Sequence, residues 1–162
     1  MPVRASALTG AAGEHYVAYK LSQMGCAAGL TRGGSPGVDL MVCNPETGAA
    51  VSIQVKTSDD AHTQRKRDNA EWWAWRFGQK TVLPPTDSRF YAFVSLHDQE
   101  GHDTPVVFIV PSAEVVKIIE SREWSDGWVG IKGPDCDKWR GDKGWHQIIE
   151  SLEMRKGEKE AS

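Results

Sequence analysis

The chain has 162 residues, of which 40% are hydrophobic and 25% are charged, and its formal net charge is -3. This length and apolar fraction suit one globular domain with a buried core, which we predict over residues 1–154. The negative charge excludes binding to a polyanion through overall basicity. The three cysteines form no CxxC pair. Their number and spacing argue against a disulfide framework and a zinc site, and indicate a reducing compartment.

The N-terminus lacks the apolar core of a signal peptide, since it begins Met-Pro-Val-Arg-Ala. No run of the sequence approaches the roughly 20 apolar residues that span a bilayer. We therefore expect a soluble, cytoplasmic protein.

A helix is predicted over Ser6–Met24, ended by Gly25. Its small and apolar residues recur at steps of three and four, which places them on one stripe facing a core. The stripe comprises Ala7, Ala11, Glu14, Ala18 and Leu21. A carboxylate in such a stripe is costly unless it meets a cation, a metal or a hydrogen-bond donor. Glu14 is therefore part of a structural salt bridge, part of a functional site, or at the border of a stripe assigned one position too wide.

A first strand is predicted over Cys26–Thr31, followed by two segments in which apolar and polar residues alternate. Residues 38–42 and 51–56 show the period of two that half-buried strands have. The segment between them, Asn-Pro-Glu-Thr-Gly at 44–48, is rich in turn formers. An antiparallel hairpin is therefore the simplest connection.

The polar face of this hairpin carries three side chains that can act together. Asp39 points away from the apolar face of its strand, and Gln54 and Lys56 share the polar side of the next strand, about 7 Å apart. Folding the hairpin about its centre places Asp39 opposite Gln54 or Lys56. One interpretation is an ordinary hairpin with a cross-strand ion pair between Lys56 and Asp39. The other is a functional site that Gln54 and Glu14 complete.

The rest of the chain adds two helices and two strands to the prediction. A helix is compatible with the spacing over residues 65–77, and strands are predicted over Arg89–Leu96 and Val106–Val110. A last helix is predicted over Ser112–Glu120, with Ser112 as its cap. The predicted order is helix, three strands, helix, two strands, helix.

This order, together with the polar residues of the hairpin, resembles the PD-(D/E)XK nuclease superfamily, over roughly Ser6–Ile119. The resemblance implies an α/β fold with a restriction-endonuclease-like core, in which helices flank a central mixed sheet of four to five strands. In that family a helix supplies a glutamate, matched here by Glu14, and the second core strand supplies an aspartate, matched by Asp39. The third strand carries an acid, any residue and a lysine. Here the triplet is Gln54-Val55-Lys56, with an amide in place of the acid.

The resemblance implies a magnesium site and hydrolysis of a phosphodiester. Mg²⁺ prefers carboxylate, carbonyl and water oxygens, and Mn²⁺ is a possible substitute. Asp39 would be its principal ligand, with the side-chain oxygen of Gln54, the backbone carbonyl of Val55, and Glu14 directly or through water. Lys56 would orient the attacking water or stabilise the transition state. One carboxylate fewer lowers the negative charge of the site and hence its affinity for metal.

Three functions remain open at this level. The first is a Mg²⁺-dependent endonuclease that hydrolyses DNA phosphodiester bonds, acting as a possible homodimer because many nucleases cut two strands by dimerising. The second is a catalytically inactive nuclease-fold protein that binds DNA or a protein partner, because a glutamine in the motif occurs in active and in inactive branches of the superfamily. The third is a protein-interaction factor with no affinity for nucleic acid.

A locally basic strip follows the motif. Between residues 62 and 80 five basic residues stand against two acidic ones. One interpretation is a solvated helix face with charges of both signs; the other is a strip that contacts nucleic acid. The basic residues are Arg65, Lys66, Arg67, Arg76 and Lys80.

The same strip contains tryptophans. Trp72 and Trp75 can stack on bases of a nucleic acid, or they can pack on the sheet as aromatic residues spaced three apart on a helix. Core packing is favoured for most of the seven tryptophans of the chain.

The region from about residue 123 is predicted to be a Trp- and Gly-rich extension. Residues 125–144 show no strong periodicity, which favours a loop layer covering a sheet edge or a recognition insert. Residues 155–162 are predicted to form a frayed or disordered tail.

Overall fold

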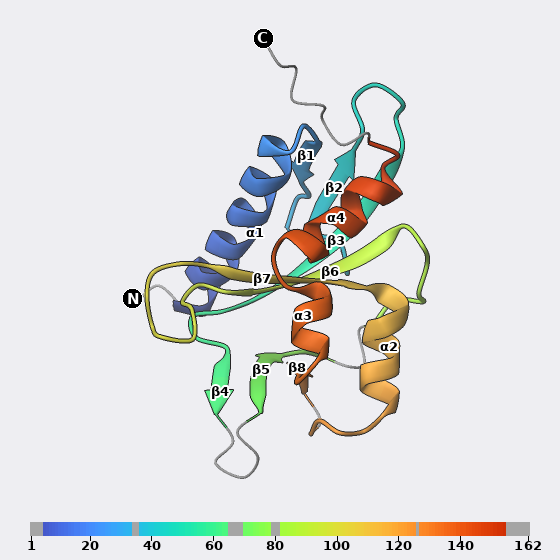
Figure 1. Cartoon of the computed structure of the whole chain (residues 1–162). Helices are drawn as coiled ribbons and strands as arrows, with labels where there is room; N and C mark the ends of the chain where they lie inside the picture. Colours follow the sequence, from blue (N-terminus) through green and yellow to red (C-terminus); the bar gives the residue numbers. More distant parts are fainter. Residues whose placement is uncertain (1–4, 34–35, 65–69, 79–81, 126, 155–162) are drawn as a thin grey trace.

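The computed structural model describes residues 5–33, 36–64, 70–78, 82–125 and 127–154 (Figure 1). These residues form an α/β structure in which helices flank a central sheet. Predictions for Arg65, Lys66, Arg67 and Lys80 and for the tail lie outside the described residues.

The central sheet has five strands in the order β1-β2-β3-β6-β7. The strands are β1 (Ala27–Leu30), β2 (Leu40–Cys43), β3 (Ala50–Ser58), β6 (Arg89–Ser95) and β7 (Val106–Pro111). β3 and β6 are parallel, and the other neighbouring strands of this sheet are antiparallel. The predicted fold class, α/β with a mixed central sheet, is confirmed.

Helices α1 (Ala5–Gln23) and α4 (Asp142–Ser151) cover one face of this sheet (Figure 1). Val17 and Leu21 of α1 are buried there with Trp145 and Ile148 of α4, against the aliphatic side chains of β2, β3, β6 and β7. The helix predicted over Ser6–Met24 is confirmed. The helix ends at Gln23, two residues before Gly25, whose φ of 89° lies in the left-handed region that suits the end of a helix.

The opposite face is covered by α2 (Ser112–Glu120), α3 (Asp135–Trp139) and a second sheet of three strands, in the order β4-β5-β8. These strands are β4 (His62–Gln64), β5 (Glu71–Arg76) and β8 (Trp128–Lys132), and both pairings are antiparallel. A separate aromatic core lies between the two sheets.

The helix predicted over residues 65–77 is wrong, because the described part of that span forms β5. Alternate residues Trp73, Trp75 and Phe77 are buried in the aromatic core at 1%, 1% and 3% exposure. A strand buries every second side chain, whereas a helix would turn one of these three rings toward solvent. Burial of three large rings outweighs the helix-compatible spacing.

The helix predicted over Ser112–Glu120 is confirmed, but the role assigned to Ser112 is wrong. Pro111 occupies the cap position, and the Ser112 side chain makes no cap hydrogen bond. Instead the Ser112 hydroxyl donates to the carbonyl of Thr86 at 2.9 Å and accepts from the Thr86 N–H at 3.0 Å. The serine therefore ties α2 to the segment that leads into β6.

Of the two alternatives for residues 125–144, the loop layer is wrong, because the segment has regular structure. It contains β8, which pairs with β5, and then α3 and α4. Cross-strand pairing and the burial of Trp145 and Ile148 stabilise regular structure in this segment, although its glycine-rich sequence shows no clear periodicity.

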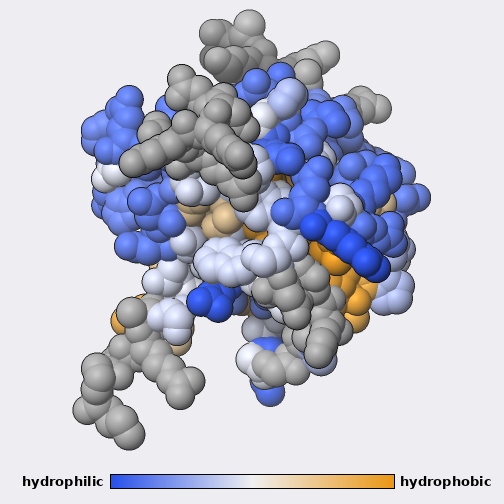
Figure 2. Space-filling model, turned by 90° about the horizontal axis from the view of Figure 1, so that it is seen from below, coloured by the Kyte–Doolittle hydropathy of each residue, from blue (hydrophilic) through white to orange (hydrophobic). Residues whose placement is uncertain are grey.

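Seen from below, much of the described surface is hydrophilic, and a hydrophobic patch lies on the side of the molecule where α2 is found (Figure 2). There α2 and residues 82–85 line an apolar groove of about 320 Å³, with Val116 and Ile119 on the helix side. Its lining includes none of the predicted catalytic residues. None of the described helices has the length and apolar character needed to cross a membrane.

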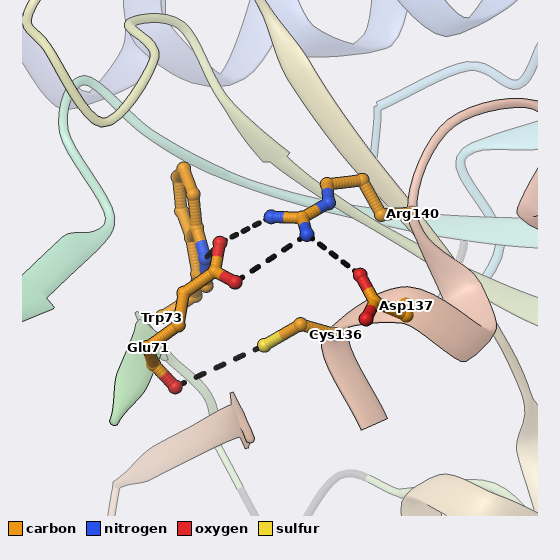
Figure 3. A network of polar contacts seen from close by, with 5 residues as sticks. All are labelled: Glu71, Trp73, Cys136, Asp137 and Arg140. Atoms are coloured by element: carbon orange, nitrogen blue, oxygen red, sulfur yellow. Dashed lines mark hydrogen bonds and ion pairs between the residues drawn. The ribbon is translucent and has the colours of Figure 1, made fainter. Parts of the chain in front are cut away.

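A polar network joins the small sheet to the C-terminal segment (Figure 3). Arg140 forms an ion pair with both carboxylate oxygens of Glu71 on β5, and a second ion pair with Asp137 Oδ1 at 2.9 Å. The indole N–H of Trp73 donates to Glu71 Oε1 at 2.9 Å. Burial, with the Glu71 charge nearby, raises the pKa of the Cys136 thiol to about 12, so this thiol is protonated at neutral pH.

Candidate active site

Asp39 lies where β2 and β3 part. The last pair of the β2–β3 ladder is Leu40 with Ile53, and the N–H of Asp39 still donates to the Ile53 carbonyl at 2.9 Å. Beyond that point the Asp39 side chain replaces the backbone as the hydrogen-bond partner of β3, since its Oδ2 accepts the N–H of Val55 at 2.7 Å. The carboxylate is thus fixed against β3, and Oδ1 accepts no hydrogen bond within the described residues. This register confirms the predicted hairpin and places Asp39 next to Gln54.

The backbone of Val55 faces the same gap. In a strand the N–H and C=O of one residue point toward the same neighbouring strand. Because the Val55 N–H meets Asp39, the Val55 carbonyl also points to the β2 edge, beyond the last β2–β3 pair. The Val55 carbonyl oxygen therefore faces the same gap as the Asp39 carboxylate.

Gln54 and Lys56 point to the face opposite α1, as the alternation predicts. Val51, Ile53 and Val55 are buried in the core beneath α1, so Gln54 and Lys56 face the aromatic core. Gln54 is only 9% exposed, and its amide forms no hydrogen bond within the described residues. An amide oxygen that accepts no hydrogen bond from the protein can accept one from a ligand.

Lys56 forms no ion pair within the described part of the chain. Its Nζ lies 5.5 Å from the centre of the Phe77 ring, a cation–π arrangement at the end of β5. The cross-strand ion pair with Asp39 that would make this an ordinary hairpin does not form. The ammonium group keeps its N–H donors for another acceptor.

Glu14 approaches the site from α1, at the border of the buried stripe. The buried residues of this helix are Gly13, Val17 and Leu21, so the predicted stripe was assigned one position too wide. Glu14 is half-buried, and its pKa is raised by burial and then by the negative charge of Asp39. The two carboxylates are thus close enough to repel each other.

Gly13 sets the distance between α1 and β3. A Cβ atom at this position would lie 1.9 Å from Thr57 Oγ1, which no packing allows. The absence of a side chain lets the helix lie directly on β3 one residue beyond Lys56. Sequence reasoning missed Gly13, although a glycine inside a predicted helix is itself a sign of close packing.

Phe77 and Leu83 were also missed. Phe77 supports Lys56, and Leu83 packs on Gly37, where an added Cβ would lie 2.5 Å from Leu83 Cδ1. Gly37 has a φ of 71°, so both its backbone and its space require glycine. No local pattern in the sequence links these aromatic and aliphatic residues to the motif, because they meet it only through the fold.

The donors present fit a hard divalent cation. Two carboxylates, an amide oxygen and a backbone carbonyl are oxygen ligands of the kind that Mg²⁺ takes. Burial and the charge of Asp39 raise the Glu14 pKa, and a cation between the two carboxylates would offset both effects. Within the described residues no group of three or more histidine, cysteine, aspartate or glutamate side chains is placed to hold a metal, so this site has two carboxylates only.

The predicted nucleic-acid-binding residues that the structure describes differ in how far they are exposed to solvent. Arg76 is exposed at the end of β5, and its guanidinium carbon lies 5.0 Å from the centre of the Trp128 ring. Trp72 and Trp75 are buried, at 6% and 1% exposure, so core packing describes both rings. Trp75 donates its indole N–H to the Val94 carbonyl at 2.8 Å, inside the protein.

Comparison with solved structures finds a bacterial homing endonuclease that matches with a TM-score of 0.59. The match covers 93% of this chain and 96% of that one, at 12% sequence identity. The chain has a nuclease-like fold. No protein-family model and no curated protein matches the sequence.

Proposed function

We propose that this protein is a Mg²⁺-dependent endonuclease that hydrolyses DNA phosphodiester bonds, a variant of the PD-(D/E)XK superfamily with glutamine in place of the motif acid. The observation that carries the proposal is the Asp39 carboxylate, fixed by the Val55 N–H where β2 and β3 part, with Glu14, Gln54 and Lys56 around it. The nuclease-like fold, over nearly the whole chain, supports it.

Each residue has a separate role in this proposal. Asp39 and Glu14 would hold the metal, with the Gln54 amide oxygen and the Val55 carbonyl as neutral ligands. Bound Mg²⁺ would neutralise phosphate charge and lower the pKa of an attacking water. Lys56, supported by the Phe77 ring and without a carboxylate partner in the described residues, would donate to a phosphate oxygen and stabilise the charge that builds up in the transition state.

The amide at Gln54 makes the affinity for free metal low. With one carboxylate fewer, less negative charge draws the cation into the site. A DNA phosphate at the site would add the missing negative ligand, so we expect metal and DNA to bind more tightly together than separately.

The test is cleavage of supercoiled plasmid and of branched DNA in Mg²⁺, Mn²⁺ or EDTA. We expect the wild type to nick or linearise DNA in metal and not in EDTA. Lys56→Ala and Asp39→Asn should lower the rate by about 100-fold or more. Lys143→Ala, at an exposed position on α4, is the matched control and should cleave as the wild type does. Cleavage that survives Asp39→Asn would contradict the proposal.

A catalytically inactive protein that binds DNA is the second candidate, favoured by the missing third carboxylate. Under this alternative no metal supports cleavage by the wild type, while binding to labelled DNA persists. Measuring both activities on the same preparation separates the two candidates.

A further inference from the structure

The two edges of the central sheet differ in what covers them. The loop that joins α3 to α4 lies beside β7 (Figure 1). There the carbonyls of Val107 and Ile109 accept hydrogen bonds from the Gly141 N–H at 3.0 Å and from Gln147 Nε2 at 3.1 Å. This edge is therefore covered by the chain itself. The other edge is β1, which in the described residues pairs with β2 alone.

The free side of β1 carries backbone groups without partners. The Thr31 N–H donates to the Asp39 carbonyl at 2.9 Å, so Thr31 and every second residue before it point toward β2. The N–H and C=O groups of Ala28 and Leu30 consequently point away from β2, and they form no hydrogen bond within the described residues. An unpaired edge of this kind is a template for another strand.

β1 also lacks the features that keep sheet edges from pairing. Charged residues, prolines and bulges commonly protect such edges. Residues 26–31 contain no charge and no proline, and the pairing with β2 is regular over all four residue pairs. Leu30 is 42% exposed. The other large apolar side chains that are exposed in the described residues lie on α1 and β2, the elements next to β1: Leu8, Tyr19 and Met41.

A second copy of the chain fits this edge. Two β1 strands can pair antiparallel about a two-fold axis normal to the sheet, with Ala28 of each copy opposite Leu30 of the other. The outward groups of each such pair then exchange two hydrogen bonds. Gly29 lies on the axis opposite its own copy, where the Cα atoms of the two strands approach to about 4.5 Å. Because β1 is neutral, the strands meet without repulsion.

We propose that this protein forms a homodimer through β1, which joins the two central sheets into one. The register that pairs the outward groups is self-complementary, and the neutral edge offers no charge that would select a different partner. The contact itself requires no metal, no DNA and no cleavage.

The dimer fixes the relation between the two candidate active sites. A two-fold axis normal to the sheet places the Gln54 and Lys56 side chains of both copies on the same side. Asp39 is opposite Thr31, two residues from the axis. Three strand spacings across the sheet and four residues along it therefore place the two Asp39 residues roughly 20 Å apart, about six base-pair steps of B-DNA. The use of this spacing to cut both strands of a duplex rests on the proposed function.

The first test is analytical ultracentrifugation in EDTA, from micromolar to millimolar protein. We expect the wild type to reach twice the chain mass of 17.9 kDa. Leu30→Lys would place two ammonium groups on diagonal neighbours across the axis, roughly 7–8 Å apart, and should weaken dimerisation by about 10-fold or more. Met41→Lys makes the same change at an exposed apolar position on β2 and is the matched control, which should dimerise as the wild type does. Thermal melts show whether both variants are folded.

The second test is cross-linking at the axis. Gly29 has room for a side chain, since an added Cβ would meet only the Met41 carbonyl at 4.0 Å. A Cα separation of about 4.5 Å is one that a disulfide can span. We expect Gly29→Cys to form a disulfide-linked dimer under mild oxidation, in a Cys43→Ser background that removes the partly exposed native thiol. Met41→Cys in the same background is the control, because its two copies would be about 14 Å apart.

The outcomes separate this inference from the proposed function. If the wild type dimerises, Leu30→Lys weakens the dimer and Gly29→Cys cross-links, the surface stands even where the protein never cleaves DNA. If the wild type remains a monomer with and without duplex DNA, the inference is overturned even where it cleaves; this is also the result expected if a foreign peptide or another segment of the chain covers the edge. If the wild type dimerises but neither β1 variant behaves as expected, the dimer uses another surface and the inference is overturned.

Discussion

The half-buried Glu14 makes stability depend on pH. Burial and the Asp39 charge raise the Glu14 pKa above its ordinary 4.5, so the folded state keeps this proton to a higher pH than the unfolded chain does. Between the two pKa values the folded state binds more protons, and stability falls as pH rises through that interval. We expect Glu14→Gln to raise the melting temperature at about pH 7, and to change it little at about pH 3, where both states are protonated.

Thermal unfolding followed by circular dichroism, in EDTA at both pH values, measures this effect. Ser22→Ala, at an exposed position near the end of α1, is a suitable control. A Glu14→Gln variant that is less stable than the wild type at neutral pH would show that the carboxylate has a stabilising partner.

Gln54 decides the charge of the candidate metal site. Gln54→Glu would place a third carboxylate next to Asp39 at a position only 9% exposed. Without metal we expect a loss of about 1–3 kcal/mol in the free energy of unfolding, because a buried carboxylate lacks a cation. With saturating Mg²⁺ the same variant should recover stability and bind the metal more tightly than the wild type.

Isothermal titration with Mg²⁺ and urea unfolding with and without Mg²⁺ measure the two effects. Gln54→Ala removes the ligand without adding charge and serves as the control. Equal Mg²⁺ affinity in all three proteins would mean that position 54 does not contact the metal.

Among the elements, α1 offers a matched pair of glycines. Gly13→Ala would force a methyl group to 1.9 Å from Thr57 Oγ1, on a β-branched side chain that is stiff at χ1. We expect a loss of about 1–3 kcal/mol in the free energy of unfolding. Gly10→Ala meets nothing within 4 Å and should gain about 0.5–1 kcal/mol from helix propensity.

Urea denaturation of both variants gives the comparison. Thr57→Ala should partly restore the stability of Gly13→Ala, since it removes the hydroxyl and methyl groups that clash and leaves only the Thr57 Cβ at 2.8 Å. A Gly13→Ala variant as stable as the wild type would mean that α1 does not depend on this close approach.

The elements that the sequence predicted well are those whose pattern is local. In α1 and α2 the apolar residues recur at helical spacing, and in β2 and β3 every second residue is buried. The turn residues Asn44 and Gly48 close the hairpin with a hydrogen bond of 2.9 Å, which aligns Asp39 with Gln54. The motif residues could therefore be placed without the tertiary structure.

The elements that were predicted wrongly from the sequence depend on contacts between residues far apart in the chain. The run Trp72-Trp73-Ala74-Trp75-Arg76-Phe77 allows helical spacing and strand alternation alike. Its full-length partner is β8, more than 50 residues later, and the short β4 pairs with its first half. The supporting residues of the site, Phe77 and Leu83, belong to the same region and were missed for the same reason.

At the scale of the whole molecule, the Glu71–Arg140 pair holds the small sheet to the C-terminal segment. Both side chains are about 30% exposed. A double-mutant cycle with Glu71→Ala and Arg140→Ala should give a coupling of about 1–3 kcal/mol, since this charged pair is largely shielded from water. The exposed Lys117–Glu114 pair on α2 is the control, and its coupling should be about 0.3–0.5 kcal/mol.

Urea unfolding of the four proteins in each cycle measures the couplings. Tryptophan fluorescence follows the aromatic core and far-ultraviolet circular dichroism follows the whole fold. If the two cycles gave equal couplings, the network in Figure 3 would be no stronger than a surface ion pair.

The parallel pairing of β3 with β6 has a consequence for the order of folding. The hairpin β2–β3 closes locally, but β6 reaches β3 only after the chain has made the excursion from Asp59 to Ser88 that contains β4 and β5. Closing such a loop costs entropy before any long-range contact forms, so this step is expected to limit the folding rate. Asp39 and Gln54 can then meet early on a nascent chain, whereas Lys56 gains its aromatic support only when the crossover closes. We therefore expect Asp39 and Gln54 to be paired during folding before the aromatic residues around Lys56 are in place.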